Sequence, residues 1–125
     1  MTRTALVIDD SRAMRTILAN ILGDIGFEVV EAADGEQALS RLEQNPDVSL
    51  ALVDWNLPVM SGLEFVSTVR ANPGFRGVRL MMVTTETEMR RMSTALDAGA
   101  DEYIMKPFTK EMLLEKLTLL GIDPQ

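Results

Sequence analysis

The sequence predicts an α/β fold in which helices cover both faces of a five-stranded parallel sheet. Short apolar runs rich in β-branched residues alternate with longer segments whose apolar residues recur every three or four positions. This alternation occurs five times within 125 residues, and no low-complexity tract or linker interrupts it. Strands that alternate with helices pair in parallel and are buried on both faces. We therefore predict that residues 1–125 form one doubly wound domain.

Each predicted strand is a short, mainly apolar run that ends beside a polar or charged residue. Such runs are typical of strands that are covered by helices on both sides. In chain order, the predicted strands cover residues 5–8, 27–32, 49–53, 78–83 and 102–105.

Each predicted helix has one apolar face and ends near glycine, asparagine or proline. In chain order, the segments that carry the apolar faces cover residues 14–25, 36–43, 63–69, 89–96 and 113–120. We expect Gly23 and Gly26 to stop the first helix, Asn45-Pro46 the second and Asn72-Pro73-Gly74 the third.

The composition excludes several classes of function. The chain has 12 basic and 19 acidic residues, and its formal net charge of −7 argues against binding to nucleic acids or anionic membranes. It contains no cysteine and no histidine, which excludes disulfides, thiol nucleophiles, histidine bases and Cys/His zinc sites. No signal peptide opens the chain, and no apolar stretch approaches the about 20 residues that span a bilayer. We therefore expect a cytoplasmic protein.

Polar and charged residues follow four of the five predicted strands: Asp9 and Asp10, then Asp54, Thr84 and Lys106. In parallel sheets of this kind, ligands bind at the carboxyl ends of the strands. Three carboxylates within about 5 Å would repel one another by roughly 3 kcal/mol per pair at an effective dielectric constant near 20. Such a cluster is unstable unless a cation binds to it or some of its carboxylates are protonated, and oxygen ligands suit Mg²⁺.

The same edge also suits a phosphoryl group. A threonine hydroxyl and a lysine ammonium can both donate to phosphoryl oxygens, and the lysine neutralises part of their charge. A carboxylate that the metal does not need can act as the nucleophile and form an aspartyl phosphate.

Several of these residues also have purely structural interpretations. Asp9, Asp10 or Ser11 could cap the first helix, since aspartate and serine are preferred at N-caps. Thr84 could simply be a strand former, and Lys106 a solvated lysine. Taken one at a time, these positions do not decide between structure and function.

Five short motifs in order resemble the receiver domain of two-component response regulators, in particular its stand-alone chemotaxis type. They are Asp9-Asp10, Asp54-Trp55-Asn56 with Met60-Ser61-Gly62-Leu63, Val83-Thr84, Ala98-Gly99-Ala100, and Tyr103 with Lys106-Pro107-Phe108. The resemblance extends over the whole chain. It implies a flavodoxin-like fold with strand order 2-1-3-4-5, which is a known property of that fold and does not follow from the spacing.

The resemblance also implies a role for each site residue. Asp54 resembles the phosphoacceptor, which takes a phosphoryl group from a histidine kinase. Asp9 and Asp10, with Asp54 and the backbone carbonyl of Asn56, resemble the ligands of Mg²⁺. Thr84 and Lys106 resemble the groups that contact the phosphoryl oxygens. The Lys106-Pro107 bond resembles the family's cis peptide.

Further residues resemble those that regulate the phosphorylated state and carry its output. Asn56 and Glu86 occupy the positions that tune dephosphorylation by water, and Thr84 and Tyr103 those of the switch pair. A downstream protein target would bind the fourth helix, fifth strand and fifth helix, and we assign four residues to this partner face: Met89, Met92, Tyr103 and Met112. We expect a monomer, with dimerisation through the leucine-rich last helix on phosphorylation as the alternative.

Thr85 and Ser61 depart from the family's pattern, since close relatives often carry alanine at the first position and many receivers carry aspartate at the second. A branched side chain at Thr85 could restrict the access of a phosphodonor, water or a phosphatase to the site. The sequence does not decide whether the target is a protein of the flagellar motor.

Three alternatives remain at this stage. A phosphorelay shuttle would pass the phosphoryl group on to a histidine phosphotransfer protein. A small Mg²⁺-dependent phosphatase would share the aspartyl-phosphate chemistry, but such enzymes place the nucleophile after the first strand in an Asp-x-Asp pattern. A nucleotide-binding module would need a glycine-rich turn, and residues 9–13 contain no glycine. We expect a signalling protein that catalyses its own phosphorylation and dephosphorylation and is not an enzyme acting on other substrates.

Overall fold

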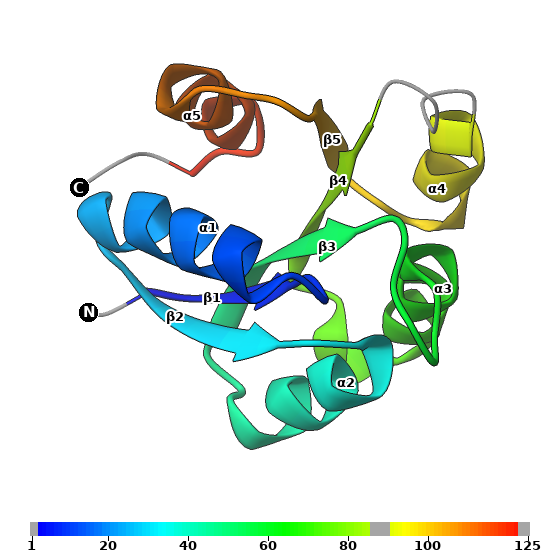
Figure 1. Ribbon diagram of the computed structural model, residues 1–125. Coiled ribbons are helices and arrows are strands. Elements are labelled where there is room, and N and C mark those ends of the chain that lie inside the picture. The colour runs from blue at the N-terminus through cyan, green and yellow to red at the C-terminus, as the bar shows by residue number, and fades with distance from the viewer. Residues whose placement is uncertain (1–2, 86–90, 123–125) are drawn as a thin grey trace.

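The computed structural model describes residues 3–85 and 91–122 and contains one five-stranded sheet in the order β2-β1-β3-β4-β5 (Figure 1). Each neighbouring pair of strands is parallel. This confirms the predicted fold class and the strand order that the resemblance implied. The strands are β1 (Arg3–Ile8), β2 (Phe27–Ala32), β3 (Val48–Asp54), β4 (Arg79–Thr84) and β5 (Glu102–Met105).

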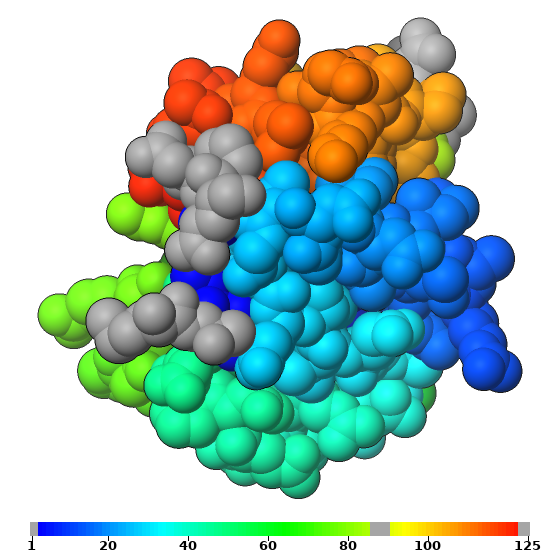
Figure 2. Space-filling model, turned by 90° about the vertical axis from the view of Figure 1, so that its left-hand side faces the viewer, coloured from blue at the N-terminus to red at the C-terminus, as the bar shows by residue number. Residues whose placement is uncertain are grey.

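The helices divide between the two faces of the sheet. They are α1 (Arg12–Asp24), α2 (Gly35–Gln44), α3 (Gly62–Ala71), α4 (Met92–Ala98) and α5 (Lys110–Leu119), with a 3₁₀ turn, η1, at Pro73–Phe75. In Figure 1, α1 and α5 lie on one side of the sheet, and α2, α3 and α4 lie on the other. Figure 2 shows α5, in orange and red, beside the blue surface of α1, with α2 at the opposite side of this view.

The core consists of two apolar clusters, one on each face of the sheet. Successive residues of a strand point to opposite faces, so each central strand contributes to both clusters. Leu6 and Ile8 of β1 belong to the cluster under α2, α3 and α4, whereas Ala5 and Val7 belong to the cluster under α1 and α5. This double burial explains why the strands appear in the sequence as continuous apolar runs.

Side chains cap the described helices of ten or more residues at their amino ends. Ser11, Asp34, Ser61 and Thr109 accept hydrogen bonds from the backbone three residues later, at the starts of α1, α2, α3 and α5. No helix among the described residues is both long and apolar enough to cross a membrane.

Of the two glycines predicted to end α1, Gly26 is right and Gly23 is wrong. Gly23 lies inside α1, which continues to Asp24, and the chain turns at Gly26, whose φ is 101°. Glycine inside a helix costs about 1 kcal/mol relative to alanine. The buried Leu22 and Ile25, which are 0% and 4% exposed on either side of Gly23, outweigh that cost.

Candidate functional site at the carboxyl edge of the sheet

Three carboxylates meet where β1 and β3 end. Asp9 and Asp10 follow β1, Asp54 is the last residue of β3, and one oxygen from each lies within 4.8 Å of the others. Asp9 and Asp54 are only 2% and 9% exposed, whereas Asp10 is exposed to solvent. The proximity that strand order predicts is therefore confirmed.

Lys106 faces this cluster from the end of β5. Its Nζ lies 3.4 Å from Oδ2 of Asp9 and 3.6 Å from Oδ1 of Asp54. The Lys106-Pro107 peptide bond is cis, as the resemblance implied, and the Lys106 backbone N–H donates to the Thr84 carbonyl at 2.6 Å. Lys106 is therefore an ion-pair partner of two of the carboxylates, and the interpretation as a solvated surface lysine is wrong.

Thr84 ends β4 next to the cluster and is fully buried. Its neighbour Val83 pairs with Asp54 across the β3–β4 ladder, which places Thr84 one residue beyond the acidic strand end. The Thr84 hydroxyl donates to the Thr85 carbonyl at 3.3 Å. A buried hydroxyl on a strand that ends next to the acidic strand end could donate to an anionic group bound there. Its place at the end of β4 also agrees with the strand-former interpretation.

The helix-capping interpretation of the acidic pair is partly right. Ser11 is the N-cap of α1, and its own backbone N–H donates to Oδ1 of Asp9 at 2.8 Å. The two oxygens of Asp9 thus accept from Ser11 and Lys106, while the same carboxylate belongs to the cluster. Capping and clustering therefore coexist.

The loop from Asn56 to Ser61 is packed tightly against the end of β3. Gly62 donates from its backbone N–H to the Trp55 carbonyl at 3.2 Å. A Cβ atom on Gly62 would lie 2.5 Å from the carbonyl oxygen of Asp54, so glycine allows α3 to begin beside the acidic strand end. Asn56 is exposed in this loop, adjacent to Trp55, where the resemblance expects a ligand carbonyl.

The residues predicted for the switch and the partner face differ in how exposed they are. Tyr103 on β5 is half-buried, and Nζ of Lys116 lies 4.5 Å from the centre of its ring. Met112 on α5 is 43% exposed. Met92 is only 3% exposed and belongs to the apolar core, so its assignment to the partner face is corrected. Glu86 and Met89 lie outside the described residues.

The polar contacts behind the cluster do not follow from the sequence pattern. Arg15 of α1 donates to the Asp9 carbonyl at 2.7 Å and to the Glu31 carboxylate at 3.1 Å. An arginine one turn into the helix after the acidic pair was a weak signal, because its partner Glu31 lies on another strand.

The arrangement fits a hard divalent cation and a phosphoryl group. Carboxylate oxygens in a half-buried cluster are the ligands that Mg²⁺ prefers. The lysine and the threonine hydroxyl supply donors for phosphoryl oxygens. Without a cation, the closely spaced carboxylates repel one another.

Comparisons with known proteins agree with this site. The model of the response regulator receiver domain family matches residues 5–118. Chemotaxis protein CheY1 of Helicobacter pylori is 44% identical over 116 residues, covering 92% of this chain and 94% of that protein. The chemotaxis protein CheY homolog of Campylobacter jejuni is 46% identical over 113 residues, covering 90% and 87%. The solved chemotaxis response regulator CheY4 of Vibrio cholerae is 34% identical, with a TM-score of 0.88 over 96% of this chain and 99% of that one.

Proposed function

This chain belongs to the response regulator receiver domain family, as a two-component response regulator of the CheY type, and from that premise we propose that Asp54 accepts a phosphoryl group from a histidine kinase. The observation that carries the proposal is the position of Asp54. Its carboxylate ends a buried strand, shares a cluster with Asp9 and Asp10, and lies 3.6 Å from Nζ of Lys106.

The cluster supports Mg²⁺ as the cofactor. Asp9, Asp10 and Asp54 would hold the ion together with the backbone carbonyl of Asn56. When bound, Mg²⁺ supplies positive charge that offsets the negative charge of the phosphoryl oxygens during transfer.

In the transfer step, a carboxylate oxygen of Asp54 attacks the phosphorus atom of a phosphohistidine. A P–O bond forms, the P–N bond breaks, and the imidazole leaves with that electron pair. Lys106 neutralises one phosphoryl oxygen, and the Thr84 hydroxyl donates to another. When the signal ends, the oxygen of a water molecule attacks the phosphorus, a P–O bond to that oxygen forms, and the P–O bond to Asp54 breaks. Inorganic phosphate is released, the proton from the water passes to the phosphate or to solvent, and the Asp54 carboxylate is regenerated. Asn56 and Glu86 would tune this hydrolysis.

The switch would act through Thr84 and Tyr103. Once the Thr84 hydroxyl moves towards a phosphoryl oxygen, the space that it leaves allows the half-buried Tyr103 to turn inward and repack α4, β5 and α5. A downstream protein would bind this surface, where Met112 is 43% exposed. The biological role follows from the relatives. Those reported above are chemotaxis proteins, which supports a role in chemotaxis for this chain. We also place the protein in the cytoplasm. On this account the chain is a switch and not an enzyme with a separate substrate.

The experiment is phosphorylation by a small acyl phosphate, followed by intact mass spectrometry. We expect one phosphoryl adduct that requires Mg²⁺, disappears with time and is absent from the Asp54→Asn variant. An adduct that persists in Asp54→Asn would contradict the assignment of the acceptor.

A further inference from the structure

We propose that Arg15 is a positioning residue for the metal site and that it acts by fixing the peptide unit between Asp9 and Asp10. The inference rests on the proposed function, because it concerns how the cluster holds Mg²⁺. Arg15 lies outside the cluster of Asp9, Asp10 and Asp54, yet on this proposal it raises the affinity of that cluster for Mg²⁺.

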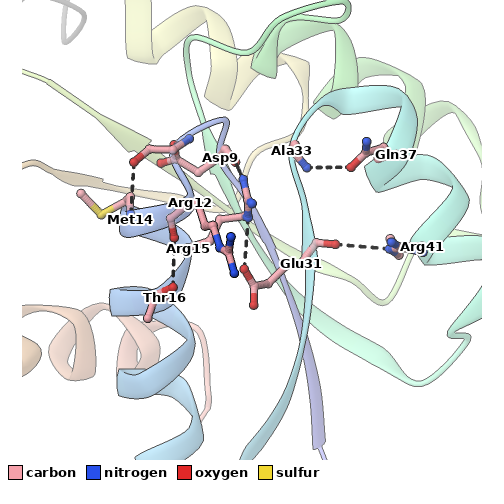
Figure 3. Close-up of polar contacts among 10 residues, drawn as sticks. Asp9, Arg12, Met14, Arg15, Thr16, Glu31, Ala33, Gln37 and Arg41 are labelled. Atoms are coloured by element: carbon pink, nitrogen blue, oxygen red, sulfur yellow. Dashed lines mark hydrogen bonds and ion pairs between the residues drawn. The ribbon is translucent and has the colours of Figure 1, made fainter.

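The guanidinium of Arg15 lies between the acidic strand end and the neighbouring strand (Figure 3). Nη1 donates to the Asp9 carbonyl at 2.7 Å, and Nε donates to Oε1 of Glu31 at 3.1 Å. The Arg15 side chain is 16% exposed, whereas that of Glu31 is 44% exposed. A planar fork held at two points has little freedom, so it can fix the carbonyl that it contacts.

The other polar groups of Asp9 are already held. Its backbone N–H donates to the Ala32 carbonyl at 3.1 Å, and its carboxylate oxygens accept from Ser11 and Lys106. Arg15 completes this set by holding the carbonyl. Because a peptide unit is planar, the direction of the Asp9 carbonyl also sets where the chain places Asp10. Arg15 therefore acts on the exposed member of the cluster through the backbone of the buried one.

The charge of Arg15 distinguishes this role from a simple electrostatic one. A guanidinium near a cation site opposes cation binding, so on charge alone its removal would strengthen the affinity for Mg²⁺. Positioning predicts the opposite sign, because loss of the contact frees the Asp9–Asp10 peptide unit. Glu31 keeps the guanidinium oriented and offsets its charge.

Arg41 provides a matched control. Its Nε donates to the Glu31 backbone carbonyl at 3.2 Å from the α2 side, so it contacts the same strand (Figure 3). The structure ties Arg41 to Gln44 and Glu31, whereas Arg15 contacts Asp9 directly. The variants Arg15→Ala and Arg41→Ala each remove one arginine from this strand end.

The test is a Mg²⁺ titration of both variants and of the wild type. Binding is monitored by the fluorescence of Trp55 and by the rise in Tm that Mg²⁺ causes. We expect Arg15→Ala to bind Mg²⁺ about 10-fold more weakly, as is typical when a group that orients a metal ligand is lost. Arg41→Ala should bind as the wild type does. The Arg15→Lys variant keeps the charge but not the fork, and it should also bind more weakly; it serves as the test if Arg15→Ala does not fold.

The outcomes separate the inference from the proposal beneath it. Wild-type affinity in Arg15→Lys, or stronger binding by Arg15→Ala, would overturn the positioning role while leaving the proposed function intact. Equal weakening in Arg15→Ala and Arg41→Ala would also overturn it, because the effect would then be a general loss of packing at this strand. If the wild type itself shows no response to Mg²⁺, both the proposed function and the inference fail.

Discussion

The two ends of the sheet handle charge in opposite ways. At the amino ends of β4 and β5, the guanidinium of Arg70 donates to the Gly99 carbonyl at 2.8 Å and to the Val78 carbonyl at 2.7 Å. It also pairs with Asp101 at 2.7 Å, and Asp101 accepts from the Leu80 backbone N–H at 2.8 Å. One arginine and one carboxylate satisfy each other and the surrounding backbone.

At the carboxyl ends, three carboxylates gather and Lys106 contacts two of them at 3.4 and 3.6 Å. The negative charge there exceeds what this lysine can offset. The difference teaches that a charge cluster that stabilises a fold is balanced within the fold, whereas a cluster that binds a cation keeps an excess. Substitutions at Lys106, Arg70 and Asp54 test this comparison, and a substitution at Val59 tests the loop beside the acidic end.

The largest effect is expected for Lys106→Ala. Loss of the ammonium removes a donor that would neutralise charge during phosphoryl transfer, and losses of this kind cost about 100-fold or more in rate. Measuring the rate of phosphorylation by an acyl phosphate at saturating Mg²⁺ checks this. A rate within a few-fold of the wild type would mean that Lys106 only balances the resting cluster.

The Arg70→Ala variant should lower the free energy of unfolding by about 2–3 kcal/mol, because it leaves Asp101 and several carbonyls without their charged donor. Urea denaturation measures this difference. Arg70→Lys should recover little of the loss, because an ammonium cannot reproduce the fork. The affinity for Mg²⁺ should stay unchanged, and a large change in it would show that the two ends are not independent.

Asp54→Asn should raise the free energy of unfolding, in contrast to Arg70→Ala, which lowers it. It removes one repelling charge from the cluster, and after loss of the ion pair with Lys106 we expect a net stabilisation of about 1 kcal/mol without Mg²⁺ at low salt. The gain should shrink as salt screens the charges. If the variant were less stable than the wild type under these conditions, the carboxyl edge would not carry excess negative charge.

The smallest effect is expected at Val59, in the loop after β3. This residue has a φ of 68° and is 72% exposed. A β-branched residue in the left-handed region costs about 1 kcal/mol or more, and asparagine tolerates it better. Val59→Asn should therefore raise the free energy of unfolding by about 0.5–1 kcal/mol. A loss of stability would mean that packing of Val59 offsets its backbone cost.

The sequence predicted much of the fold because apolar periodicity is a local signal. The bounds of β2 and β5 agree with the prediction, and β1 begins two residues earlier than predicted, at Arg3. Of the two glycines predicted to stop α1, Gly26 lies at the turn, whereas Gly23 lies inside the helix, one residue before its end at Asp24. The strand order came from the resemblance, because hydrophobic patterns do not show which strands pair.

The sequence was enough to predict that the carboxylates and the lysine of the candidate site lie together, because the carboxyl ends of parallel strands meet at one edge of the sheet. The roles of these residues in phosphoryl transfer stay predictions. The contacts of Arg15 and Arg70 could not be foreseen, since their partners are largely backbone carbonyls and residues distant in sequence; Gly99 follows Arg70 by 29 positions. The helical spacing of Met92 suits a core face as well as a partner face, and its burial decides for the core.

The measurement that tests the central claim most directly uses Trp55, which follows Asp54 and is 7% exposed. Its fluorescence is recorded while Mg²⁺ and then beryllofluoride, a mimic of the phosphoryl group, are added to the wild type and to Asp54→Asn. The account predicts a saturable change with Mg²⁺ in the wild type and a second change with beryllofluoride that Asp54→Asn lacks. No change on either addition, or the same second change in Asp54→Asn, would contradict the claim that the excess charge at the carboxyl edge serves metal and phosphoryl binding.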